Sequence, residues 1–160
     1  MKDETKYIAR LEAHDVKPTA MRILLLRTMM AHEDAFSLQS LEDELDTVDK
    51  STIYRTITLF LTHHLIHAID DGTGMFKYAV CSPDCHCGED DGAIDHMHAH
   101  FNCERCGRTF CLQATQVPVV ALPGDFRVHS INYVLKGLCP DCSTSVSHSS
   151  RDRSHGIEKQ

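Results

Sequence analysis

Several features that mark common protein classes are missing from this 160-residue sequence. It has no apolar run near the roughly 20 residues that a membrane-spanning helix needs, and residues 1–10 are charged where a secretory signal is apolar. A positive net charge is missing as well, because the formal charge is −7 and acidic residues outnumber basic ones on both sides of residue 80. We therefore expect a cytoplasmic protein without a membrane partner, in which any binding to nucleic acid depends on a local patch.

The signatures of an enzyme are also missing. The sequence offers no pairing of a nucleophile with a base, no glycine-rich loop of the kind that cradles phosphate, and no metal site left open for a substrate. A high histidine content alone does not make a hydrolase. We expect this protein not to be an enzyme.

Cysteine is absent up to residue 80, and all eight cysteines follow. A reducing compartment keeps such residues as thiols unless a metal binds them. The change in composition predicts two units, residues 1–80 and 96–142, joined by a Cys- and Asp-rich loop at 81–95. From residue 143 the chain is mostly Ser, His and charged residues, which predicts a disordered tail over 143–160 because little apolar surface is available to offset the entropy of ordering.

Helical periodicity dominates the first unit. Thr19 and Ser37 are expected to cap helices, and the short link before the last helix predicts a helix-turn-helix. Two strands around a turn of hairpin composition complete a winged-helix arrangement. The predicted helices are 20–30, 37–45 and 50–63, after a short one around Tyr7–Leu11, and the strands are 65–69 and 75–80.

The second unit is predicted to contain short strands at 98–104, 108–112 and 127–136. An apolar link at 117–122 separates the last two strands. Pro118 and Pro123 limit the length of any helix that this link forms.

Two cysteine pairs in the second unit have the spacing of a zinc site: Cys103 with Cys106, and Cys139 with Cys142. Each pair spans a turn tight enough for both sulfurs to reach one ion, and a closed tetrahedral zinc site stabilises folding rather than performing catalysis. Two disulfides are the ordinary alternative, which the reducing compartment disfavours; four unrelated buried thiols are another, which the paired spacing disfavours. We predict one structural Zn²⁺ per chain.

A run of alternating histidines, His96, His98 and His100, precedes the first cysteine pair. On a strand the three imidazoles project to one face, where neutral imidazole suits zinc, iron or nickel. A polar strand face or a flexible loop is the alternative. Nearby thiols at Cys81, Cys85, Cys87 and Cys111 favour a second metal site, whose candidate ligands are the three histidines with Cys81 and Cys111. The segment with Cys81, Cys85 and Cys87 could instead form a thiol loop open to oxidation.

Four motifs occur in the order and near the spacing of the ferric uptake regulator family, which the sequence resembles over residues 5–142. The resemblance rests on their combination, since each alone occurs in other proteins. The motifs are Thr19-Ala20-Met21-Arg22, Lys50-Ser51-Thr52-Ile53-Tyr54-Arg55-Thr56, His98-Ala99-His100-Phe101-Asn102-Cys103-Glu104-Arg105-Cys106-Gly107 and Gly137-Leu138-Cys139-Pro140-Asp141-Cys142.

The resemblance implies an α+β protein, with an N-terminal winged helix-turn-helix and a small C-terminal α/β dimerisation domain carrying the four-cysteine zinc site. It implies a homodimer that represses genes of iron or zinc homeostasis by binding a palindromic double-stranded DNA operator when metal is bound. Tyr54 and Arg55 match family positions that meet the major groove, and Lys17 matches one that meets the backbone or minor groove. Neighbouring polar residues complete the predicted DNA contacts: Arg22, Ser51 and Thr52.

The family's regulatory metal site is only partly present. Its usual His, acidic and Glu ligand positions match Ala35, Ala79 and Cys111, and only the pair His98 and His100 is intact. At the ligand positions of a second family metal site, this sequence has Ala99 and Ile131, with His129 nearby. Softer donors favour Zn²⁺ over Fe²⁺ as the regulatory ion.

Two alternatives stay open. A regulator of the same family could respond to peroxide or thiol oxidation instead of metal. A zinc-ribbon interaction protein could use the same four cysteines without binding DNA.

Overall fold

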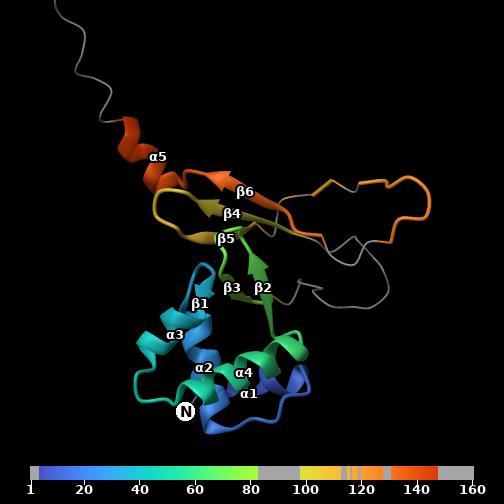
Figure 1. Cartoon of the computed structure of the whole chain (residues 1–160). Helices are drawn as coiled ribbons and strands as arrows, with labels where there is room; N and C mark the ends of the chain where they lie inside the picture. The colour runs from blue at the N-terminus through green and yellow to red at the C-terminus, as the bar shows by residue number, and fades with distance from the viewer. Residues whose placement is uncertain are drawn as a thin grey trace, which may run out of the picture.

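The computed structural model describes residues 4–82, 98–112, 115, 117–118, 120–127 and 131–147. Within these ranges the chain forms five helices and six strands, with the strands in two three-stranded sheets. Figure 1 shows the helices α1 to α4 at one end and the second sheet with α5 at the other. The predicted α+β class is confirmed. No helix among these residues has both the length and the apolar character needed to cross a membrane.

The first unit is built on four helices: α1 Thr5–Ala13, α2 Ala20–Ala31, α3 Leu38–Glu44 and α4 Lys50–Thr62. Both predicted caps are confirmed, since the Thr19 side chain accepts from the Arg22 N–H and Ser37 forms a capping box with Ser40. Their apolar faces meet in one core, whose fully buried side chains include Leu11, Leu25, Leu26, Met29, Leu41, Ile53, Phe60 and Leu65.

The first sheet has the order β1-β3-β2 and consists of β1 Phe36–Ser37, β2 Ile66–Asp70 and β3 Phe76–Val80. β2 and β3 form the predicted antiparallel hairpin, and Gly72 and Gly74 give its turn the positive φ angles, 75° and 87°, that it requires. The two-residue strand β1 was not predicted from the sequence. Helices followed by this hairpin make the winged-helix arrangement.

The second sheet has the order β5-β4-β6 and consists of β4 Ala99–Cys103, β5 Thr109–Leu112 and β6 Val134–Gly137. β4 pairs antiparallel with β5 and parallel with β6. The strand predicted at 127–136 is therefore shorter and begins later than expected. The described residues of the apolar link, 117–118 and 120–122, form no helix.

The last element among the described residues is a helix that the sequence did not predict, α5 Pro140–Ser147. The disordered tail predicted from residue 143 is therefore wrong for residues 143–147. Pro140 suits a first helical position, Asp141 favours the positive end of the helix, and the Ser143 N–H bonds the Cys139 carbonyl at 2.8 Å. The tail at 148–160 and the loop at 83–95 lie outside the described residues.

The two sheets contact each other through the hairpin and the loop before β1 (Figure 1). The Ala35 N–H donates to the Thr109 carbonyl at 2.8 Å, and Asp34 pairs with Arg108 at 2.6 Å. At the hairpin turn, the Asn132 amide donates to the Asp70 carbonyl at 2.5 Å. The end of the hairpin thus lies against the second sheet.

Candidate metal centres

The four predicted zinc cysteines come together at one end of the second sheet. Cys103 ends β4, Cys106 lies in the turn that follows it, and Cys139 and Cys142 lie at the start of α5. Their sulfur atoms all lie within 4.8 Å of one another, and the Cys106 and Cys139 sulfurs are 3.8 Å apart. A tetrahedral ion with Zn–S bonds of about 2.3 Å separates its sulfurs by about 3.8 Å, so the spacing fits zinc.

The electrostatics of this four-cysteine cluster also suit a cation. Main-chain N–H groups of Cys106 and Cys139 lower the pKa of the Cys103 thiol to about 6, and the Cys139 N–H lies 3.3 Å from that sulfur. Burial and the neighbouring sulfurs raise the pKa of Cys142 to about 12. Four sulfurs so close together become stable thiolates only when a positive ion offsets their repulsion.

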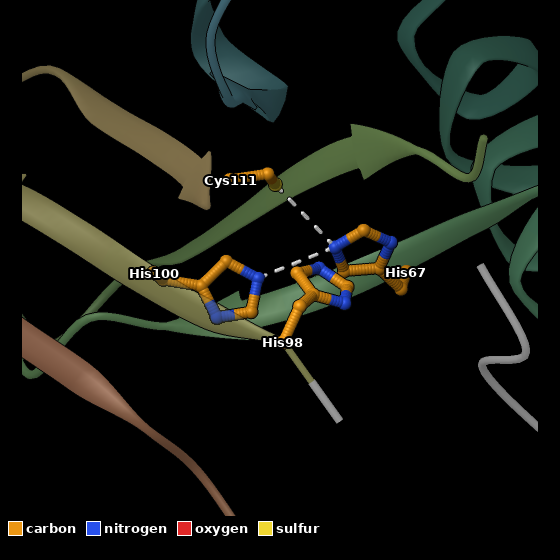
Figure 2. A group of neighbouring side chains, drawn as sticks. All are labelled: His67, His98, His100 and Cys111. Atoms are coloured by element: carbon orange, nitrogen blue, oxygen red, sulfur yellow. Dashed lines mark hydrogen bonds between the residues drawn. The ribbon is translucent and has the colours of Figure 1, made fainter. Parts of the chain in front are cut away.

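A second cluster spans the two sheets and contains His67 from β2, His98 from just before β4, His100 from β4 and Cys111 from β5. Figure 2 shows the three imidazoles and the Cys111 side chain gathered around one point. The His67 Nε2 lies 3.4 Å from the His100 Nε2 and 3.7 Å from the Cys111 sulfur. All four donor atoms lie within 4.8 Å of one another.

Strand register explains why these residues meet. His100 stands directly opposite Cys111 in the β4–β5 pair, so their side chains share a face. His67 stands opposite Ala79 in the β2–β3 pair. Ala79 is the position where the family resemblance implies an acidic ligand, and the facing position on β2 supplies an imidazole instead.

Burial tunes the second cluster for metal binding. Burial, with a smaller contribution from neighbouring imidazoles, lowers the pKa of His67 to about 3 and that of His100 to about 4. Both rings are therefore neutral near pH 7, the form that binds metals. Among the described residues the buried His98 Nε2 has no hydrogen-bond partner, as expected of a nitrogen placed to bind an ion.

Cys81, a predicted ligand, lies beside this cluster rather than within the quartet. Its sulfur is 3.4 Å from the Nδ1 of His67, whereas the quartet gathers on Nε2, the other ring nitrogen. Burial raises the pKa of the Cys81 and Cys111 thiols to about 11. Cys81, Cys111, Ala35 and Ala79 all line a cavity of about 430 Å³ next to the cluster. The predicted ligand His96 lies outside the described residues, as do Cys85 and Cys87.

Sequence reasoning missed His67 as a donor. The signal was present, because pairing the predicted strands about the Asp70–Gly74 turn puts His67 on the same face of the hairpin as Ala79, its register partner in the structure. In a strand, alternate side chains lie on the same face. Because Ala79 replaces a family ligand, a substitute donor was to be expected on the face of the hairpin that carries Ala79.

The predicted DNA-contacting residues lie on exposed parts of the first unit. Tyr54 is 62% exposed on α4, and Arg55 and Ser51 are exposed beside it, with Thr52 partly so. Lys17 and Arg22 adjoin at the start of α2, where the Arg22 guanidinium donates to the Lys17 carbonyl at 2.7 Å. These groups are accessible to a ligand, and the side chain of Ser51 also bonds Asp49.

The sequence is similar to a known protein family and to one of its characterised members. The model of the family described as the ferric uptake regulator family matches residues 13–121. The zinc uptake regulation protein of Mycobacterium tuberculosis is 26% identical over 140 residues, covering 82% of this chain and 98% of that protein.

Solved structures of low identity share the fold. A zinc uptake regulator complexed with zinc and DNA has a TM-score of 0.61 at 19% identity, covering 91% of this chain and 98% of that chain. The ferric uptake regulator of Vibrio cholerae has a TM-score of 0.54 at 15% identity, covering 83% of this chain and 99% of that chain.

Proposed function

The chain belongs to the ferric uptake regulator family, and on that premise we propose that it is a zinc-responsive repressor that binds a DNA operator as a homodimer. It is a metal-dependent transcription regulator and not an enzyme. The observation that carries the finer proposal is the cluster of His67, His98, His100 and Cys111, because it draws donors from both sheets.

The four-cysteine cluster is proposed to hold a permanent zinc. All four of its donors come from the second unit, and two of them anchor α5. Four thiolates leave no coordination position for water or substrate, as in structural zinc sites. Zinc at this cluster would stabilise the second unit without sensing anything.

The cluster of three histidines and Cys111 is proposed to hold the regulatory zinc. Imidazole and thiolate suit zinc, whereas Fe²⁺ sites draw more on hard oxygen donors, and the quartet offers none. A relative named as a zinc uptake regulation protein supports the same ion. Control of zinc homeostasis genes follows as the proposed physiological role.

The position of His67 suggests how zinc would reach the DNA-binding surface. β2 follows α4 directly, and the Leu65 N–H bonds the Phe60 carbonyl of α4 at 2.9 Å. Zinc bound to His67 and to the second sheet would therefore hold α4 at one angle to the second unit. In a dimer, that angle would set the spacing of the two recognition helices on a palindromic operator.

Contacts to DNA are assigned to exposed residues of α4 and the start of α2. Arg55 can pair with a guanine edge or a phosphate, and the Tyr54 ring can contact a thymine methyl. Lys17 and Arg22 would contact phosphates, with Ser51 and Thr52 at the N-terminus of α4. Because the net charge is −7, binding would depend on this local patch.

The homodimer is assigned to the second unit. β6 is an edge strand, and Leu135 on it and Leu138 just after it are 50% and 43% exposed. Further exposed apolar side chains lie in the preceding segment: Val120, Leu122 and Phe126. An apolar surface of this kind is suited to a second copy of the chain.

Metal content and DNA binding measured together test the proposal. Protein purified without added metal is to be analysed before and after mild chelation, with binding to a duplex selected from a random pool by the zinc-loaded protein. We expect one retained zinc, one removable zinc, and binding that needs the second and weakens with salt. Binding that ignores the removable metal would refute zinc sensing.

Two histidine variants sharpen this test. His67→Asn should abolish the removable zinc and DNA binding but keep the zinc of the four-cysteine cluster. His64→Asn is the matched control, because His64 is exposed and its φ of 53° is one that asparagine accepts. Equal effects of the two variants would contradict the assignment of His67.

Regulation by thiol oxidation is the second candidate, favoured only by the closeness of Cys81 and Cys111 to His67. Burial and raised pKa values make both thiols poor nucleophiles in the absence of metal. Mass shifts on these cysteines or histidines after peroxide, coupled to lost DNA binding, would favour this candidate over zinc sensing. An interaction protein that binds no DNA would be unaffected by changes on α4.

A further inference from the structure

The turn of the β2–β3 hairpin carries a buried carboxylate that the metal sites do not use. Asp71 is 1% exposed. Its Oδ2 accepts hydrogen bonds from the Asn102 amide at 3.2 Å and the Thr109 hydroxyl at 2.9 Å, and it pairs with the Lys77 ammonium at 2.9 Å. Its Oδ1 accepts from the Thr73 N–H at 3.0 Å. The carboxylate thus joins the hairpin to β4 and β5.

Asp71 is charged in this setting. Burial alone would raise its pKa, but hydrogen bonds from Thr73, Lys77 and Thr109 hold that pKa well below its usual range. The Lys77 ammonium also donates to the Gly107 carbonyl at 2.5 Å, in the turn that carries Cys106. Removing one partner of a buried ion pair is strongly destabilising, because the other charge is left buried and unpaired. Asp71 and Lys77 therefore hold the hairpin and the second sheet together.

The network lies beside the histidine cluster on the same face of the second sheet. Asn102 is two residues from His100 on β4, and Thr109 is two residues from Cys111 on β5. Residues two apart on a strand project to the same side. Asn102 and Thr109 are also register partners, as His100 and Cys111 are, so the two pairs stand in adjacent rows.

The hairpin turn lies close to the second sheet. A Cβ atom added at Gly72 would lie 3.0 Å from the Lys136 ammonium on β6, and the φ of 75° there already favours glycine. The Asn132 amide holds the Asp70 carbonyl from the same side. This part of the hairpin therefore serves as a docking element between the two units.

We infer that Asp71 is a positioning residue that docks the hairpin on the second sheet without metal and thereby presents His67 to His98, His100 and Cys111. The docking stands on the Asp71 contacts themselves. Its consequence for metal affinity rests on the proposed function of the histidine cluster.

The test compares Asp71→Asn with Asp70→Asn in the full chain. Both variants lose one negative charge, but Asp70 is exposed, and its carboxylate bonds only the Gly72 N–H at 3.0 Å among the contacts described. Thr109→Val serves as a milder second variant if Asp71→Asn folds poorly, since it removes one donor to the carboxylate.

The first readout is hydrogen exchange of the hairpin amides after removal of the labile metal. We expect Asp71→Asn to speed exchange of β2 and β3 at least about tenfold, Thr109→Val to do so less, and Asp70→Asn to match the wild type. Unchanged exchange in Asp71→Asn, or the same change in Asp70→Asn, would overturn the inference.

The second readout is titration with Co²⁺, whose absorption reports the geometry of a thiolate–imidazole site. We expect Asp71→Asn to weaken Co²⁺ binding by roughly 10- to 100-fold, the size typical of changes around metal ligands, and Asp70→Asn to leave it unchanged. Equal Co²⁺ affinity of Asp71→Asn and the wild type would overturn the inference. If the wild type bound no Co²⁺ at the histidine cluster, the proposed function would be refuted, and the hydrogen-exchange comparison alone would test the docking role of Asp71.

Discussion

The Nε2 atoms of His67 and His100 lie 3.4 Å apart although 33 residues separate the two histidines in sequence. One belongs to the hairpin that follows α4 and the other to the second sheet. Two imidazoles this close cannot both be protonated without strong repulsion. Their approach therefore makes this contact between the two units sensitive to acid.

The metal-free protein is expected to lose stability in acid. The folded pKa values of His67 and His100 are about 3 and about 4, below the ordinary 6.5. Between pH 6.5 and these lower values, the unfolded chain therefore binds more protons than the folded chain. The contribution of these histidines to the free energy of unfolding is greatest above pH 6.5 and falls as the pH decreases. The slope should not exceed about 1.4 kcal/mol per pH unit for each histidine. Urea unfolding of chelated protein at pH 7.5 and 5 measures this, and His67→Asn should flatten the dependence.

Cys111 should determine the metal preference of the second cluster. Its thiol is a soft donor with a pKa raised by burial to about 11, so a metal must displace its proton at pH 7. Cys111→Ser should weaken zinc relative to manganese or iron and remove the sulfur-to-metal charge-transfer band of the Co²⁺ form. Between roughly pH 5 and 9, zinc affinity of the wild type should rise about tenfold per pH unit from this one proton.

Cys81→Ser is the control for that assignment. The Cys81 sulfur faces the Nδ1 of His67, away from the side on which the quartet gathers. The charge-transfer band should therefore survive in Cys81→Ser. Loss of the band in this variant and its retention in Cys111→Ser would reverse the roles of the two cysteines.

Some parts of this architecture could be predicted from the sequence because they are local. The helices α2 and α3 begin after the predicted caps Thr19 and Ser37, α4 has its buried residues at helical spacing, and the ligands of the four-cysteine cluster lie in short, regular pairs. β1 could not be predicted, since two residues carry no period and the Phe36 pairing with Tyr78 is set by tertiary contact. α5 was missed because its Ser- and Thr-rich sequence favours helix weakly, and Cys139 and Cys142 hold its first turn.

Part of the candidate site could be predicted for the same reason. His98, His100 and Cys111 lie near one another in sequence or in a motif, but His67 enters from another sheet. Finding it required the register of the hairpin, and a shift of one residue would have placed its side chain on the opposite face. The hydrogen bonds of Asp71 could not be predicted from the sequence, because they depend on how the two units pack.

Removal of the zinc from the four-cysteine cluster should unfold the second unit. Cys139 is buried, and the cluster holds β4 and the start of α5 together. Cys142→Ser should therefore lose the tightly held zinc and much of the thermal stability, since the binding energy of a structural zinc is folding energy. Differential scanning calorimetry with metal analysis measures both, and Cys111→Ser should keep this zinc. A Cys142→Ser protein with unchanged melting and zinc content would contradict the structural role.

A reciprocal pair of hydrogen bonds should stabilise the first unit. The His14 Nδ1 lies 3.0 Å from the His63 carbonyl, and the His63 Nδ1 lies 2.9 Å from the His14 carbonyl. These residues follow the last residues of α1 and α4, so the pair joins two helix ends. His63→Ala should lower the free energy of unfolding by about 1 to 2 kcal/mol. In a double-mutant cycle with His14→Ala, measured by urea unfolding, the two losses should not add, and full additivity would mean that the bonds contribute independently.

Arg55→Ala should remove operator binding without affecting either metal. Arg55 is exposed on α4, next to Tyr54, and both metal clusters lie elsewhere in the chain. If Arg55 contacts a base edge, its loss should weaken operator binding at least about tenfold and relax discrimination at one base pair. If it contacts a phosphate, its loss should weaken binding to all DNA sequences alike and reduce the slope of log affinity against log salt concentration by about one. Arg27→Ala provides the matched control, because Arg27 is equally an exposed arginine but lies on α2 outside the predicted contacts. Titrations at several salt concentrations separate base from phosphate contact. If Arg27→Ala and Arg55→Ala weakened binding equally, α4 would not be the recognition helix, and the link from zinc through His67 to DNA would need another route.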